Sequence, residues 1–292
     1  MGFAQTVPAV ISGTTERIVS FESKFIDARI IDIWLPNGYS DQKKYAVLYM
    51  QDGQMLFDPT TTWNKQAWEI DDCGTQLMSK NLVQQFIVIG IWNGGKVRHA
   101  SYFPEKPFTD LTSNQQQLVV KQLQDAGKTA EIFVPNSDNY LKFLTQELKP
   151  YINSKYSVYK DLQHTFIGGS SMGGLISIYA LCEYPTVFGG AICMSTHWPG
   201  SFASENNPMP QAFINYLEKH LPQPDKHKIY FDYGNQTLDA LYPALQQKVD
   251  QLMTHKGYKS NNWQTKFFDG DDHSEKSWKN RLHIPLSFIL KK

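Results

Sequence analysis

Strand-like and helix-like segments alternate along most of this 292-residue chain, and few folds accommodate that order. β-Branched and aromatic side chains fill five short runs, which predict buried strands. The five runs are AVLYMQ (46–51), FIVIGI (86–91), HTFIG (164–168), GGAICMS (189–195) and KIYFDYG (228–234). Such alternation predicts an α/β fold with a mostly parallel central sheet and helices on both faces.

The flanking segments complete this pattern. RIVSFES (17–23) and ARIIDIWLP (28–36) predict two antiparallel strands at an edge of the sheet. WQTKFF (263–268) predicts a last strand before a C-terminal helix. The other predicted helices run from Trp68 to Met78, from Asn139 to a stop near Pro150, from Met172 to Pro185, and over 238–253, where Leu238, Leu241, Leu245, Val249 and Leu252 share one face.

Residues 93–135 interrupt the alternation, because they contain no sustained apolar period. Long irregular segments in compact domains usually form lids or binding loops. We therefore expect a cap or lid-like insertion around residues 93–138, with a disordered surface insertion as the alternative. A hydrophobic content of 41% is enough for one large core, so we expect a single domain over residues 1–292.

The charge balance argues against a polyanionic partner. Lys and Arg number 28, as do Asp and Glu, so no overall field draws the chain to nucleic acid or to an anionic membrane, and a small molecule is the expected partner. No apolar run approaches the length of a membrane span, which predicts a soluble protein. The start, MGFAQTVPAV, lacks a secretory signal, although GFAQ resembles the end of a cleaved one. A cytoplasmic location and a periplasmic or secreted one both stay open, as does the oligomeric state.

The stretch FIGGSSMGGLISIYAL (166–181) joins a predicted strand to a predicted helix. Within it, residues 169–173 match G-x-S-x-G, and this frame selects Ser171 rather than Ser170. A nucleophile exposed at a sharp strand-to-helix turn needs small residues two positions to either side, and the helix N-terminus stabilises nearby negative charge. A phosphate-binding loop needs a lysine that is absent here. A nucleophile elbow is therefore the preferred interpretation, and a plain glycine turn is the alternative.

A serine nucleophile needs a base, and His273 is the preferred one of the eight histidines. It lies in FFDGDDHSEKSW, directly after the last predicted strand, where a Gly-Asp loop can place an imidazole over the carboxyl edge of the sheet. His99 and His197 follow strands and are expected to line the pocket without catalysing. Structural roles suffice for the remaining histidines, which are His164, His220, His227, His255 and His283.

The same loop could instead bind calcium through Asp269, Asp271, Asp272 and Glu275. An EF-hand-like loop requires its glycine at the sixth position, whereas here the glycine is second and a histidine occupies a ligand position. The three cysteines also lack metal-ligand spacing. We therefore expect neither a metal nor a cofactor.

Two further parts of the site follow from the strand order. The acid that orients the base is expected after the strand that precedes the last one, which favours Asp239 over Asp232, a residue within that strand. An oxyanion hole requires two backbone N–H groups. One is expected from Met172, directly after the nucleophile, and the other from Gly53 or Gln54 in the loop after AVLYMQ, with Gln54 preferred.

These motifs together carry a resemblance to a known family. The segments are VLYMQDGQMLFD, IGIWNGGKVRHASYFP, LTQELKPYI, IGGSSMGGLISIYALCEYPTVFG and DGDDHSEKSW. From about residue 18 to 290 the chain resembles the "putative esterase" family of α/β-hydrolases, which includes esterase D, enterochelin esterases and bacterial feruloyl esterases. Family members place the acid in a loop of the form Gly…Asp-x-x-Tyr, which Asp239-Ala-Leu-Tyr242 matches, although some siderophore-cleaving relatives depend little on an acid.

The resemblance implies an α/β-hydrolase fold and a serine carboxylesterase, in which Ser171, His273 and Asp239 form a triad that works through an acyl-enzyme. An acyltransferase that uses the same serine and a non-catalytic binding protein on this fold are the alternatives. Siderophore, feruloyl, acetyl-sugar and short-chain esters are not distinguished by the sequence. The residues expected to bind the substrate are Trp92, Arg98, Tyr102 and Trp198.

Overall fold

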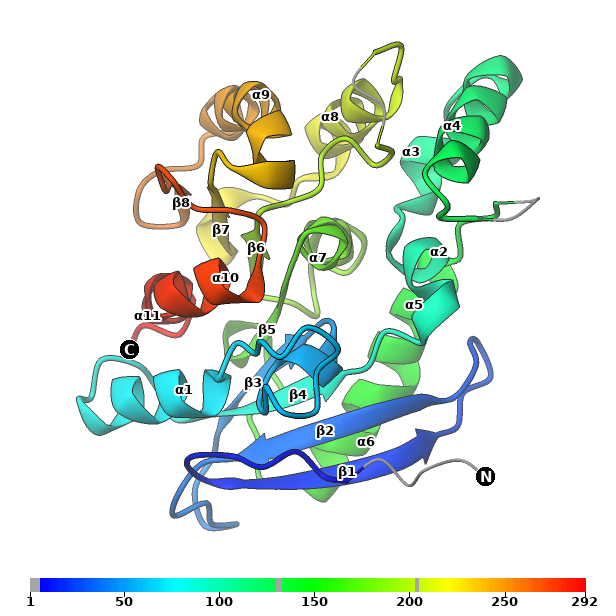
Figure 1. Cartoon of the computed structure of the whole chain (residues 1–292). Helices are drawn as coiled ribbons and strands as arrows, with labels where there is room; N and C mark the ends of the chain where they lie inside the picture. The colour runs from blue at the N-terminus through cyan, green and yellow to red at the C-terminus, as the bar shows by residue number, and fades with distance from the viewer. Residues whose placement is uncertain (1–5, 130–132, 203–204) are drawn as a thin grey trace.

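The computed structural model describes residues 6–129, 133–202 and 205–292, and the strands of these residues form one sheet (Figure 1). Its order is β1-β2-β4-β3-β5-β6-β7-β8, in which β1 and β2 are antiparallel to their neighbours and the other strands are parallel to one another. The strands are β1 (Thr14–Phe21), β2 (Arg29–Leu35), β3 (Ala46–Met50), β4 (Phe86–Ile91), β5 (Thr165–Ser170), β6 (Gly190–Met194), β7 (Lys228–Tyr233) and β8 (Trp263–Phe267). The predicted parallel sheet with an antiparallel N-terminal edge is confirmed.

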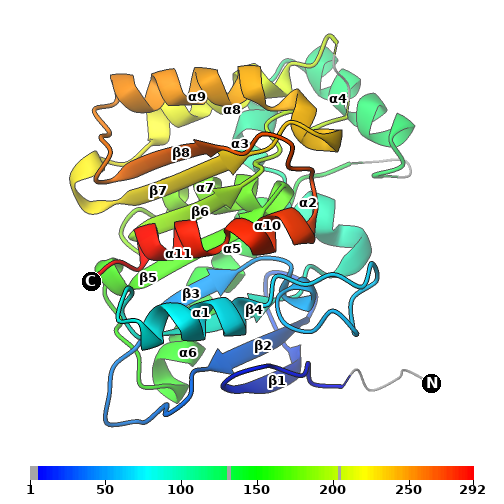
Figure 2. The ribbon, with the colours of Figure 1, turned by 60° about the vertical axis from the view of Figure 1, so that its left-hand side comes forward.

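Helices cover both faces of the sheet (Figure 2). One layer consists of α1 (Ile70–Ser79), α10 (Glu275–Arg281) and α11 (His283–Ile289). The other layer contains α5 (Ser137–Lys142), α6 (Lys149–Lys155), α7 (Met172–Glu183), α8 (Met209–His220) and α9 (Pro243–His255). Side chains of β3 alternate between the two cores, because Leu48 and Met50 join the first and Val47 and Tyr49 join the second.

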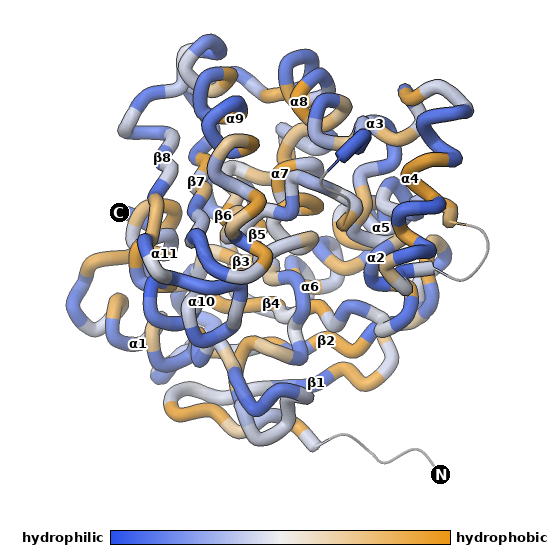
Figure 3. Tube along the Cα trace, turned by 45° about the horizontal axis from the view of Figure 1, so that its top comes forward, coloured by the Kyte–Doolittle hydropathy of each residue, from blue (hydrophilic) through white to orange (hydrophobic). Residues whose placement is uncertain are grey.

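The edges of the sheet differ from its centre in hydropathy. The central strand β4 is buried at every residue, whereas β8 is partly exposed along its length. Figure 3 shows the same contrast, with hydrophobic stretches along β2 and β4 and a more hydrophilic β8. An edge strand with polar side chains is protected against pairing with another chain.

The helix predicted from Asn139 does not stop near Pro150. It continues through the π-helical segment η3 (Phe143–Leu148) into α6, which ends at Lys155. Pro150 occupies the first turn of α6, where the wider π turn before it removes the need for the N–H that proline lacks.

The helix predicted over 238–253 divides into two. The short helix η6 (Thr237–Leu241) precedes α9, which begins at Pro243 because proline favours the first helical turn. As a result, Leu241 is exposed instead of sharing the buried face of Val249 and Leu252. Helix α8 lies in a stretch for which the sequence predicted no element.

The predicted insertion is mostly helical in its described part. It contains η2 (Gly95–Val97), α2 (Arg98–Tyr102), α3 (Glu105–Thr109) and α4 (Ser113–Asp125). A capping box between Thr112 and Gln115 starts α4, a local signal that the glutamine-rich composition obscured. The other short helices are η1 (Gly53–Met55), η4 (Leu162–His164) and η5 (Pro224–Lys226). None of the helices in the described residues is long and apolar enough to cross a membrane.

Candidate active site

Ser171 lies at the turn between β5 and α7 with φ 58° and ψ −125°. A non-glycine residue at positive φ costs on the order of 1–3 kcal/mol and persists where the surrounding structure enforces it. Ser171 is half-buried, whereas Ser170 belongs to β5 and is only 5% exposed. The turn therefore presents the hydroxyl of Ser171 and not that of Ser170.

The glycines of the turn leave space for the loop after β3. A Cβ atom on Gly169 would lie 2.9 Å from Cβ of Gln51, and one on Gly173 would lie 3.0 Å from the same atom. Gln51 is fixed from the other side by a hydrogen bond from the Tyr140 hydroxyl. The G-x-S-x-G spacing thus allows the β3 loop to pack directly against the turn that carries Ser171.

His273 and Asp239 form a close pair at the carboxyl ends of β8 and β7. Nδ1 of His273 lies 2.6 Å from Oδ1 of Asp239, which is fully buried. The second carboxylate oxygen, Oδ2, accepts hydrogen bonds from Ser195 Oγ at 2.6 Å and from the Gly234 N–H at 2.7 Å. Because Nδ1 faces the carboxylate, Nε2 is the ring nitrogen that can accept a proton from a hydroxyl.

Asp232, the competing acid, has a different partner. It is fully buried in β7, where its Oδ1 accepts hydrogen bonds from Arg281 Nη2 at 2.9 Å and from the Ser195 N–H at 3.1 Å. Burial raises the pKa of Asp232 to about 6, against the opposing effect of the Arg281 charge. The structure therefore places Asp239 on the imidazole and Asp232 on a guanidinium.

Tyr242 lies close to Ser171, to His197 and to His273. Its hydroxyl interacts with Ser171 and lies 2.9 Å from Nδ1 of His197, and its ring centroid is 5.8 Å from that of His273. Burial, followed by the proximity of His273, lowers the pKa of His197 well below its usual value, so His197 is neutral. His197 thus lies behind the site as a buried neighbour, and Tyr242 brings the two halves of the site together.

The two predicted oxyanion donors lie at helix starts. Met172 is the first residue of α7, and Gln54 lies in η1, whose Gly53 packs against Gly90 of β4. Helix geometry leaves the first N–H groups without an intrahelical acceptor, so these amides can bind an anion.

Ser171 and Met172 lie on the wall of a pocket of about 870 Å³, a size that suits a small ligand. Most of its other described lining belongs to the insertion. The cationic lining residues are Lys96, Arg98 and Lys128, and the apolar ones include Val97, Phe133, Val134 and Phe202. No Asp or Glu occurs among the lining residues that the structure describes.

Arg98 is the one predicted substrate-binding residue that lines this pocket. Its guanidinium binds both carboxylate oxygens of Asp52, at 2.7 and 2.8 Å, and so ties the insertion to the loop that contains Gln54. Close by, burial, followed by the charges of Arg98 and Lys128, lowers the pKa of His99 to about 3.

The other three predicted substrate-binding residues are not among the described lining residues, and each instead has a partner elsewhere. Trp92 donates from Nε1 to Asp32, and Trp198 donates from Nε1 to Gln246, both at 2.8 Å. Tyr102 is fully buried and accepts a hydrogen bond from the Asp52 N–H at 3.2 Å. These three side chains pack against other parts of the protein, where they bury apolar area and still satisfy their polar atoms.

The acidic residues of the His273 loop bind other protein groups. Asp271 pairs with Arg281 at 2.8 Å, and Asp272 accepts hydrogen bonds from Ser274 and Ser277. Asp269 accepts from Asn235, and Glu275 accepts from Asn64. In the part of the chain that the structure describes, no group of three His, Cys, Asp or Glu side chains is arranged to hold a metal ion.

Three residues near the acid escaped the sequence analysis. Ser195, at the end of β6, and Trp278 and Arg281, on α10, contact Asp239 or its immediate neighbours. The i, i+3 spacing of Trp278 and Arg281 in a helix directly after His273 is the signal that could have indicated them.

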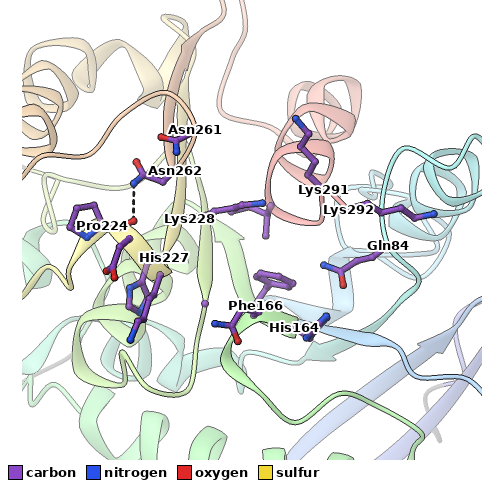
Figure 4. Close-up of a pocket in the computed structure, with 15 residues that line it drawn as sticks. Gln84, His164, Phe166, Pro224, His227, Lys228, Asn261, Asn262, Lys291 and Lys292 are labelled. Atoms are coloured by element: carbon purple, nitrogen blue, oxygen red, sulfur yellow. Dashed lines mark hydrogen bonds between the residues drawn. The ribbon is translucent and has the colours of Figure 1, made fainter.

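A second pocket, of about 480 Å³, lies at the opposite end of the parallel strands (Figure 4). Its lining comes from the segments before β5, β6, β7 and β8, including His164, Gly189, His227 and Asn262. Ligands of open α/β sheets bind at the carboxyl ends of the strands, so the pocket beside Ser171 is the candidate active site.

Comparisons with known proteins identify the family of the chain. A family model described as "Putative esterase" matches residues 26–286. The Uncharacterized protein YjcH of Bacillus subtilis (strain 168) is 24% identical over 187 residues, which are 64% of this chain and 63% of that protein. The match therefore spans less than two thirds of the length of that relative.

Solved structures share the fold at low sequence identity. A ferulic acid esterase matches with a TM-score of 0.64 and 20% identity, covering 95% of this chain and 97% of that one. The enterobactin esterase FES from Shigella flexneri matches with a TM-score of 0.66 and 14% identity, covering 97% of this chain and 60% of that one. The predicted α/β-hydrolase fold is confirmed, and the chain belongs to the "Putative esterase" family.

Proposed function

We propose that this protein is a serine carboxylesterase with Ser171, His273 and Asp239 as its triad. The observation that carries this proposal is that Tyr242 contacts both a strained serine on the pocket wall and a histidine whose Nδ1 lies against a buried carboxylate. Family membership supports the same chemistry. In this arrangement the serine is the nucleophile, the imidazole is the base and the carboxylate fixes its tautomer.

In the proposed reaction, Ser171 Oγ attacks the ester carbonyl carbon while His273 Nε2 takes the hydroxyl proton. The backbone amides of Met172 and Gln54 stabilise the oxyanion of the tetrahedral intermediate. The intermediate collapses, His273 returns the proton to the leaving alcohol, and an acyl-enzyme remains. Water then attacks the acyl-enzyme with the same proton transfers, so that a carboxylic acid and free Ser171 result. These steps need no cofactor.

We further propose that the insertion around residues 93–138 is a cap within a single esterase domain and selects the substrate. Its side chains supply most of the described pocket lining, and the Arg98–Asp52 pair connects it to the proposed oxyanion loop. Phe133 and Phe202 suit an aromatic acyl group. The similarity to solved structures named for ferulic acid and enterobactin supports the same substrate class. Lys96 and Lys128 favour an ester that also carries negative charge.

Labelling with a fluorophosphonate tests the proposal, because this reagent phosphonylates activated serines. The wild-type protein and Ser170→Ala should be labelled on the peptide that contains residue 171, and Ser171→Ala should not. Hydrolysis of 4-nitrophenyl and feruloyl esters should follow the same order. Absence of labelling in the folded wild-type protein would favour a binding role, and preferred transfer to added alcohols would favour an acyltransferase.

A further inference from the structure

A buried polar cluster lies directly behind the proposed acid. Ser195 is fully buried at the end of β6 and has φ 42°, a left-handed conformation that is costly for serine. Its Oγ contacts three groups, which are Asp239 Oδ2 at 2.6 Å, Trp278 Nε1 at 3.0 Å and Arg281 Nη2 at 2.9 Å. The strained backbone brings one hydroxyl into contact with all three.

The chemistry of these groups fixes the direction of each hydrogen bond. Indole and guanidinium nitrogens can only donate, so both bonds from Trp278 and Arg281 end on the lone pairs of Ser195 Oγ. The single hydroxyl proton of Ser195 then has one acceptor left, which is Asp239 Oδ2. Ser195 thus accepts hydrogen bonds from two donors on α10 and directs its own hydroxyl proton at the carboxylate of Asp239.

This orientation extends to His273. With Ser195 and the Gly234 N–H both bound to Oδ2, the other carboxylate oxygen, Oδ1, is directed at Nδ1 of His273. We infer that Ser195, held by Trp278 and Arg281, is a positioning residue that sets the rotation of Asp239 and hence the tautomer of His273. The inference rests on the proposed triad.

Arg281 also fastens the loop that contains His273. It bonds to Asp271 at 2.8 Å, two residues before the histidine, and to Asp232 of β7 at 2.9 Å. Helix α10 follows the same loop, so one guanidinium links the loop, the sheet and the Ser195 hydroxyl. Its three neighbouring carboxylates, including Asp239 at 4.0 Å, explain why an arginine that is 2% exposed stays charged.

A double-mutant cycle between Ser195 and Asp239 tests this inference. Ser195→Ala should lower kcat for a 4-nitrophenyl ester about tenfold or more with little change in KM, since a hydrogen bond to a charged group is worth about that much. In the Asp239→Asn background, the same change should alter kcat less than about twofold, because it acts through that carboxylate. Thr165→Val is the matched control, since Thr165 is also buried but lies at the start of β5 and donates its hydroxyl to the Asp161 carbonyl, away from the site.

Ser195→Gly protects the test against failure to fold. Glycine adopts φ 42° without strain, so this variant should fold and show the kcat loss of Ser195→Ala. Trp278→Phe should give a smaller loss that also disappears in the Asp239→Asn background. Full kcat in folded Ser195→Gly, or an equal loss in both backgrounds, would overturn the positioning role. Full activity of Asp239→Asn would overturn it too, whereas labelling of Ser171 reports separately on the esterase proposal.

Discussion

The turn that carries Ser171 and the pair formed by His273 and Asp239 belong to one candidate site but are built differently. The shape of the turn at residues 169–173 comes from glycine spacing and one strained serine, and backbone hydrogen bonds with Met194 and His197 hold it in place. The pair joins residues 34 positions apart in the sequence and depends on groups from β6, β7 and α10. A short sequence motif thus exposes the proposed nucleophile, whereas a network of hydrogen bonds between distant segments positions the proposed base.

This difference predicts different consequences of substitution. A change within the turn affects exposure of one hydroxyl, and its effect should remain local. A change in the network alters hydrogen bonds among fully buried charges, so stability and turnover should both respond. Substitutions in the turn and in the network should therefore differ in whether stability changes together with turnover.

The largest effect is expected in the turn. Ser171→Ala should lower kcat/KM for 4-nitrophenyl esters by about a thousandfold or more, because nucleophile and base act as a unit. Ser170→Ala should retain most activity, since Ser170 belongs to the buried strand. Steady-state kinetics on both folded variants provides the measurement. Loss of activity in Ser170→Ala together with activity in Ser171→Ala would contradict the assignment of the turn.

The next effect concerns the two carboxylates of the network. Asp239→Asn should reduce kcat about a hundredfold while the protein stays folded and Ser171 stays reactive, because the imidazole loses its tautomer control. Asp232→Asn should lower thermal stability more than it lowers turnover, because it removes one of the carboxylate charges that balance the buried Arg281. Thermal unfolding and turnover measured on both variants distinguish these outcomes. A slow Asp232→Asn beside a fully active Asp239→Asn would move the acid to β7.

The stability of the protein should decrease at acidic pH because of His99, which lines the pocket beside Ser171. Its pKa in the folded protein, about 3, lies below the ordinary value of 6.5, so the folded state favours the neutral ring. The stability that folding gains from keeping His99 neutral is fully present above pH 6.5 and is lost as the pH falls toward 3. At pH 4.5 the loss should be about 3 kcal/mol.

Urea unfolding at pH 7.5 and pH 4.5 measures this effect. His99→Phe, which places a ring between Phe103 and Phe133, should lose correspondingly less stability on acidification than the wild-type protein. The exposed His255, replaced by Gln, is the control and should behave like the wild type. Equal acid sensitivity of His99→Phe and the wild type would show that His99 is protonated without cost.

The smallest effect is expected at the mouth of the pocket. Replacing Lys96 and Lys128 together by Met should raise KM for a 4-nitrophenyl hemisuccinate about two- to fivefold, because exposed charges interact weakly through water. KM for the neutral 4-nitrophenyl butyrate should change little. The measurement is the ratio of the two KM values, at low and at high salt, in the variant and in the wild type. An equal ratio in both proteins would show that these charges do not select the substrate.

Several parts of the fold and site were predictable because their signals are local. Apolar runs indicated β3 to β7 in the correct order, and the glycine frame singled out the serine that the backbone exposes. His273 and Asp239 followed from their positions after the last two strands, which parallel topology brings to one edge. The helices of the insertion were missed, because a polar, glutamine-rich helix has a weak apolar period.

The sequence by itself determined the α/β order, the family and the turn at Ser171, since each is carried by short segments whose own residues lie close together in the chain. Only the tertiary structure decided that Asp239 faces His273, that Asp232 faces Arg281, and that Trp92, Tyr102 and Trp198 pack away from the described pocket. Only the fold brought Ser195, Trp278 and Arg281 together behind the acid. Hydrogen bonds among buried groups depend on distances of tenths of an ångström between distant segments, and such distances are set when the strands and helices pack.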